Sequence, residues 1–146
     1  MARRTFFSFK YDDVSRAMVV RNSWITQDRS ARGFIDAAEF EKLKRNGDAA
    51  IRRWIDEQMD GTSVTVVLVG AHTNQSRWVK YEIERSEYLG HGLLGIDISK
   101  IKDLNGLTTD CCGSMPAGYD FYRWNNDGGY ANMAAWIEKA AATAGR

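Results

Sequence analysis

The chain has 146 residues, of which 44% are hydrophobic and 27% charged, and its formal net charge is +1. This length and composition are typical of one globular domain and exclude a disordered tail, a collagen-like repeat and a disulfide-dense module. A net charge near zero produces no field that attracts DNA, RNA or an acidic membrane, so we expect no nucleic-acid partner. We predict a single domain over residues 1–146.

No stretch of the sequence reaches the roughly 20 apolar residues that a membrane helix needs, and residues 1–4 do not begin a secretory signal. We therefore expect a cytoplasmic protein without membrane contact. The two cysteines, Cys111 and Cys112, are adjacent, so a bridge between them would be strained. Neither they nor the two histidines, His72 and His91, have the spacing of metal ligands, and we expect no metal site.

Strands and helices are expected to alternate along the chain. Short apolar or aromatic runs predict strands, and apolar residues at helical spacing predict helices. In chain order the expected elements are strand 5–9, helix 12–24, a short strand at 33–36, helix 47–59, strand 63–69, helix 77–89, strand 93–98, strand 119–124 and helix 129–142. The run at 63–69 is β-branched and apolar on both faces, which is typical of a central strand in a parallel sheet.

This alternation predicts an α/β fold: a flavodoxin-like, mainly parallel sheet of five strands in the order 2-1-3-4-5, with helices on both faces. In such a fold, ligands bind in the crevice at the carboxyl ends of strands one and three. The segments in which we look for chemistry are therefore 8–13, 36–39 and 70–82. Residues 100–118 are expected to form a surface excursion.

The first expected strand ends in polar and aromatic residues that would lie at this crevice. Ser8 and Phe9 close the strand, and Tyr11, Asp12 and Asp13 follow. The pattern suits a binding site, but aspartates at such a position are also common helix caps. The residue types alone leave both interpretations open.

A second group lies on the helix expected at 77–89. Trp78 and Glu82 are four residues apart, so they share a face of that helix, next to its buried stripe but not part of it. A carboxylate beside an indole suits the binding of sugar hydroxyls or the support of a positive charge. The alternative is a solvent-facing glutamate paired with Arg85 or Lys80, and spacing does not decide between the two.

Several common motifs are absent. The chain has no G-x-G-x-x-G after its first strand, no G-x-x-x-x-G-K and no G-x-S-x-G, which disfavours a bound dinucleotide cofactor, a P-loop nucleotide and a serine nucleophile on an elbow. No residue lies at the spacing of a catalytic or ligand partner from His72. Asp97 is either buried or at the crevice. Trp54, Trp124 and Trp136 are expected to pack in the core.

Taken together, several segments resemble a known family. Residues 6–9 with Asp12 resemble the first conserved box of Toll/interleukin-1 receptor (TIR) domains, and residues 76–82 resemble the segment in which catalytic TIR domains carry their glutamate. Blocks at 19–24, 34–37, 77–83 and 119–130 are similar to the TIR-like proteins of Thoeris anti-phage systems in particular. The order and spacing of these blocks are more specific than any one of them.

The resemblance implies a flavodoxin-like TIR fold and an enzyme that cleaves the nicotinamide-ribose bond of NAD, with NAD as substrate and no bound cofactor. It gives Glu82 the catalytic role. The substrate-binding residues that it implies are Ser8, Phe9, Tyr11, Asp36, Ala37 and Trp78. The product is ADP-ribose where water attacks, and a cyclic ADP-ribose isomer where an atom of the substrate itself attacks.

The resemblance also implies partners. The product would be a diffusible nucleotide that activates a separately encoded effector, and a phage-derived trigger would switch the enzyme on. Self-assembly is expected to complete the site through the loop at 36–42 of a neighbouring copy. Phe40, flanked by charged residues and expected to be exposed, is the candidate contact.

Three other functions share features with this sequence. A non-catalytic TIR-like interaction module is the main alternative, because a fold does not determine a function. A phosphoacceptor receiver domain also has acidic residues after its first strand, but it needs an aspartate at the end of the third, where this chain has Gly70, Ala71 and His72. A nucleoside-processing transferase with a glutamate at the anomeric carbon is the third.

Overall fold

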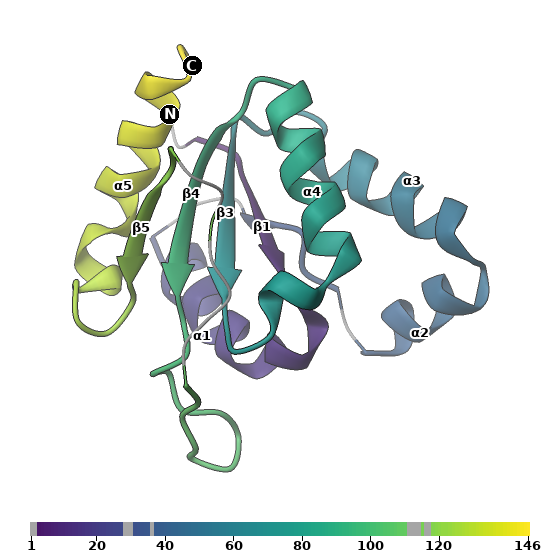
Figure 1. The fold of residues 1–146 in the computed structure, drawn as a ribbon, viewed down its shortest axis with the longest axis horizontal. Helices are drawn as coiled ribbons and strands as arrows, with labels where there is room; N and C mark the ends of the chain where they lie inside the picture. Colours follow the sequence, from purple (N-terminus) through teal and green to yellow (C-terminus); the bar gives the residue numbers. More distant parts are fainter. Residues whose placement is uncertain (1–2, 28–30, 36, 111–114, 116–117) are drawn as a thin grey trace.

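The computed structural model describes residues 3–27, 31–35, 37–110, 115 and 118–146. At its centre lies a parallel sheet whose strands follow the order β2-β1-β3-β4-β5 (Figure 1). The strands are β1 (Thr5–Phe9), β2 (Ala31–Arg32), β3 (Val64–Val69), β4 (Gly92–Asp97) and β5 (Asp120–Arg123). The predicted α/β fold and strand order are confirmed.

Helices cover both faces of the sheet, as a parallel sheet requires (Figure 1). On one face lie α1 (Val14–Ile25) and α5 (Gly129–Thr143), and on the other α3 (Asp48–Met59) and α4 (Arg77–Tyr88). A further helix, α2 (Ala37–Arg45), packs beside α3, and short 3-10 turns η1 (Tyr11–Asp13) and η2 (Thr73–Gln75) follow β1 and β3.

The core depends on strands that are apolar on both sides. Every residue of β3 and β4 is buried. Alternate side chains of β3 point to opposite faces: Val66 and Leu68 join the cluster under α1 and α5, whereas Val67 and Val69 pack with Val79 of α4. The sheet is therefore a central layer packed on both faces, and its strands position the residues at its carboxyl edge.

Two local expectations were wrong. The second strand is β2 and not residues 33–36, because Gly33 has a φ of 94° that ends the extended conformation. A Cβ at this position would lie 2.3 Å from the Phe7 carbonyl oxygen, so the chain passes β1 too closely for any side chain. The segment at 36–42 was expected to be a loop, but from Ala37 onward it belongs to α2, whose last turn carries basic residues that suit a helix C-terminus.

Gly33→Ala is expected to lower the free energy of unfolding by about 1 to 3 kcal/mol, because the methyl group meets backbone and the φ is unfavourable. Gly47→Ala is the matched control: Gly47 has nearly the same φ, 91°, with nothing within 4 Å of an added Cβ. Urea unfolding of the two variants separates the clash from the φ preference. Equal losses of unfolding free energy in the two variants would show that the close approach of residue 33 to Phe7 does not destabilise Gly33→Ala.

Part of the predicted excursion at 100–118 is anchored to α1. The buried guanidinium of Arg16 donates to the carbonyl oxygens of Ile101 (2.8 Å) and Leu107 (2.9 Å) and faces the Asp103 carboxylate at 3.7 Å. Cys111 and Cys112 lie outside the described residues. Across the described ranges, no helix is long and apolar enough to cross a bilayer.

Candidate active site

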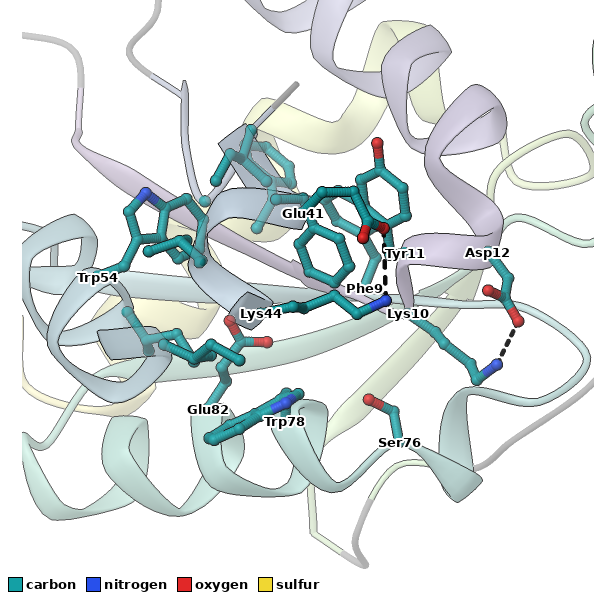
Figure 2. A pocket seen from close by; sticks show the side chains of 17 residues that line it. Phe9, Lys10, Tyr11, Asp12, Glu41, Lys44, Trp54, Ser76, Trp78 and Glu82 are labelled. Carbon is teal, nitrogen blue, oxygen red and sulfur yellow. Dashed lines mark hydrogen bonds and ion pairs between the residues drawn. The ribbon is translucent and has the colours of Figure 1, made fainter. Parts of the chain in front are cut away.

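A cavity of about 440 Å³ opens at the carboxyl end of β1, between α2, α3 and α4 (Figure 2). Its volume is in the range of small-molecule sites, and apolar and aromatic side chains form most of its wall. Glu82 and Trp78 extend from α4 on one side, and Phe9, Tyr11 and Lys44 lie opposite (Figure 2). The cavity thus occupies the edge of the sheet where the fold predicts a ligand.

Glu82 is a buried carboxyl group. Only 6% of the residue is exposed, and its Oε1 accepts a hydrogen bond of 2.8 Å from the Ser8 hydroxyl at the end of β1. The solvent-facing alternative, paired with Arg85 or Lys80, is therefore wrong. Glu82 also belongs to the buried face of α4 and does not merely border it.

The placement of Glu82 depends on where α4 begins and on which of its residues face the sheet. Ser76 caps the helix, and its hydroxyl accepts a hydrogen bond of 3.2 Å from the Val79 amide. From that starting point, the helical period turns Val79, Glu82 and Ser86 toward the sheet. The cap fixes where the helix begins, and the packing of this buried face on the sheet brings Glu82 to the cavity.

Burial raises the pKa of Glu82 from 4.5 to about 8, and the hydrogen bond from Ser8 opposes part of this rise. The free protein therefore holds this carboxyl mainly protonated at neutral pH. A positively charged group in the cavity would favour the carboxylate instead. A buried carboxyl with a strongly shifted pKa in the wall of a cavity is typical of catalytic sites.

The residues at the end of β1 and just after it take different positions around Glu82. Ser8 is fully buried and contacts Glu82, not the cavity, so the structure places it as a hydrogen-bond donor to the carboxyl group. Phe9 and Tyr11 both line the cavity. Phe9 packs on the Phe34 ring with a centroid separation of 5.3 Å.

Within the segment 36–42, Phe40 and Glu41 line the cavity of their own chain. Asp36 lies outside the described residues, and Ala37 begins α2, where its side chain is not described. Phe40 was expected to be exposed, but it is half-buried and stacked on Tyr11, with ring centroids 4.2 Å apart and planes within 4°. The Lys44 ammonium lies 5.2 Å from the Phe40 ring centroid and 3.4 Å from the Glu41 carboxylate.

Trp78 lines the cavity beside Glu82, with the Arg77 and Arg52 guanidinium groups 4.6 Å and 5.9 Å from its ring centroid. Trp54 also lines the cavity, although its helical stripe indicated only core packing. The stripe does mark an inward face, but nothing in the local sequence shows that this face reaches an empty volume. Trp54 is thus a cavity residue that sequence reasoning missed.

The remaining polar residues near the sheet edge lie elsewhere. Asp13 starts α1 without a side-chain cap and ion-pairs with Arg16 at 3.5 Å, and burial raises its pKa. His72 is exposed, and the carboxylate of buried Asp97 accepts a hydrogen bond from the Ser99 amide. In the described part of the chain, no group of three His, Cys, Asp or Glu side chains could hold a metal ion.

The sequence matches a family model described as "Thoeris protein ThsB, TIR-like domain" over residues 6–103. It is also 41% identical over 139 residues to "Putative cyclic ADP-D-ribose synthase ThsB1" of Bacillus cereus (strain MSX-D12). That alignment covers 93% of this chain and 72% of the Bacillus protein. The family match spans β1 to β4 and includes both Ser8 and Glu82.

Proposed function

This chain belongs to the ThsB family of Thoeris TIR-like domains, and on that premise we propose that it cleaves the nicotinamide-ribose bond of NAD. We propose a cyclic ADP-ribose isomer as the main product and ADP-ribose as the product of competing hydrolysis. The name of the Bacillus relative supports the cyclic product. The observation that carries the proposal is the buried Glu82 carboxyl in the cavity wall, four residues after Trp78.

The chemistry needs one negative charge near the ribose. As the bond from the anomeric carbon to nicotinamide breaks, its electron pair goes to the pyridinium nitrogen, so nicotinamide leaves as a neutral molecule. Positive charge then develops on the ribose, and the Glu82 carboxylate stabilises it, as a carboxylate does in glycosidases. A nucleophilic atom of the adenosine part then bonds to the anomeric carbon and closes the ring, or water attacks that carbon and gives ADP-ribose. In each case the attacking atom gives up any proton that it carried.

The apolar wall supports the cyclic product. Trp78, Phe9 and Tyr11 surround the cavity with aromatic surface, which disfavours water at the anomeric carbon and suits stacking on a ring of the substrate. Lys10 and Lys44 also line the cavity and carry charge opposite to that of a diphosphate. Asp36 and Ala37 stay predictions as substrate-binding residues, as does the absence of a cofactor other than the substrate.

The wider biological role follows from the family. We propose that the product is a diffusible signal for a separately encoded effector in anti-phage defence, that a phage-derived trigger activates the chain, and that it acts in the cytoplasm. We also propose self-assembly of the active form. Phe40 is a poor probe of assembly, because it packs on Tyr11 and lines the cavity of its own chain.

The direct test is incubation of the purified protein with NAD and identification of the products by mass, with and without an extract of phage-infected cells as a source of trigger. We expect nicotinamide in an amount equal to the cyclic ADP-ribose isomer and ADP-ribose together, with the cyclic isomer as the main product and low turnover until the extract is added. Release of no nicotinamide under either condition would contradict the proposal and favour the non-catalytic interaction module.

A further inference from the structure

Three polar side chains form a continuous buried line between α4 and the sheet. The Ser86 hydroxyl, one turn after Glu82, donates to the Glu82 carbonyl oxygen at 2.7 Å and lies 2.6 Å from Thr65 Oγ1 in β3. Thr65 Oγ1 in turn lies 3.2 Å from Nδ1 of His91. Ser86 and Thr65 are completely buried. The His91 amide also donates to the Ser86 carbonyl oxygen, at 2.9 Å.

This line differs from ordinary packing of a helix on a sheet. Around it, α4 and the sheet meet through aliphatic side chains such as Val67, Val79 and Leu93, which allow small shifts along the helix axis. A hydrogen bond between buried hydroxyls is directional, and each group loses its solvation without a partner. The contact between Ser86 and Thr65 therefore specifies one height of α4 on the sheet, meaning one position along the helix axis. Apolar packing alone does not specify it.

The hydrogen bond between Ser86 and Thr65 is in register with the hydrogen bond between Ser8 and Glu82. Ser8 pairs with Val67 of β3, two residues after Thr65 and on the same face of the sheet. Ser86 follows Glu82 by four residues on the same face of α4. Four helical residues rise about 6 Å and two strand residues about 6.6 Å, so the two helix-to-sheet hydrogen bonds have matching spacing.

We propose that Ser86 and Thr65 are positioning residues that fix the height of α4 on the sheet and so hold the Glu82 carboxyl against Ser8. Neither residue lines the cavity or touches the substrate site. Their effect on NAD cleavage rests on the function proposed above, whereas their effect on the contact between Glu82 and Ser8 is independent of it. Removing the hydroxyl of Thr65 lets α4 slide, and the hydrogen bond from Ser8 to Glu82 is then made for only part of the time.

A double-mutant cycle measures this coupling without any activity assay. The carboxyl titration of Glu82 is followed by NMR with carbon-labelled glutamate in the native and Thr65→Val backgrounds, each with and without Ser8→Ala. In the native background Ser8→Ala raises the Glu82 pKa, because a hydrogen bond that favours the carboxylate is lost. In the Thr65→Val background we expect about half of that shift or less.

Two variants control for a merely structural effect. Thr65→Ser keeps the hydroxyl, and in this background Ser8→Ala is expected to raise the Glu82 pKa by the full amount. Thr5→Val removes the hydroxyl of another fully buried threonine in the same sheet, on the face away from α4, and the full rise is expected in that background too. Should Thr65→Val not fold, Ser86→Ala removes the same hydrogen bond and takes its place in the cycle.

Kinetics provide a second measurement. Where the protein cleaves NAD, Thr65→Val is expected to lower kcat about tenfold with KM nearly unchanged, and Thr65→Ser to restore kcat. If Ser8→Ala raises the Glu82 pKa equally in the native and Thr65→Val backgrounds, this inference is overturned whether or not NAD is cleaved. A native protein that releases no nicotinamide would overturn the proposed function alone, because the titration cycle can still be measured.

Discussion

Glu82→Gln is expected to remove most NAD turnover while the protein stays folded. The amide has nearly the shape of the carboxyl group and still accepts the hydrogen bond from Ser8, but it cannot carry the negative charge that stabilises the developing ribose cation. Loss of one such electrostatic group costs on the order of 3 to 4 kcal/mol in the activation barrier, or roughly 10²- to 10³-fold in kcat. The measurement is nicotinamide release at saturating NAD, with the extract of phage-infected cells present.

The matched control is Glu84→Gln. Glu84 is exposed and lies on the same helix, roughly 200° around its axis from Glu82, so the same chemical change is made away from the cavity. We expect turnover within about twofold of the native protein for this variant. A folded Glu82→Gln protein with native turnover would show that Glu82 is not the catalytic carboxylate.

The pH dependence of kcat/KM is the second large effect. Because burial raises the pKa of Glu82 to about 8 and the proposed chemistry uses the carboxylate, kcat/KM is expected to rise about tenfold per pH unit below pH 8 and then to level off. The pyridinium ring of bound NAD carries a positive charge that favours the carboxylate, so kcat should reach its plateau at a lower pH than kcat/KM. Initial rates over a range of pH give both profiles.

The same titration has a signature in stability. Between pH 4.5 and about 8 the folded protein keeps the Glu82 proton and the unfolded chain releases it, so the stability of the native protein falls as the pH rises. Glu82→Gln lacks this loss and should be more stable than the native protein at pH 8, by an amount that disappears below pH 4.5.

The kinetic prediction has its own contradicting outcome. A kcat/KM that is flat or falls between about pH 6 and 9 would indicate that the neutral carboxyl group of Glu82 is the active form.

Local patterns in the sequence determined most of the architecture. The strands β1, β3 and β4 were predicted because each contains a short apolar or aromatic run, which in β3 is also rich in β-branched residues and buried on both faces. The spacing of Trp78 and Glu82 placed both on one face of a helix, since the helical period acts over a single turn. For these strands and for this helix, the prediction and the structure agree.

The surroundings of Glu82 were decided by tertiary structure alone. Its partner, Ser8, is 74 residues away, and only the packing of α4 on β1 converts a glutamate of ambiguous exposure into a buried carboxyl with a raised pKa. The stacking of Phe40 on Tyr11 likewise brings α2 to the cavity across a separation of 29 residues. Burial and desolvation depend on which distant segments exclude water from a side chain, and no local period or spacing carries that information.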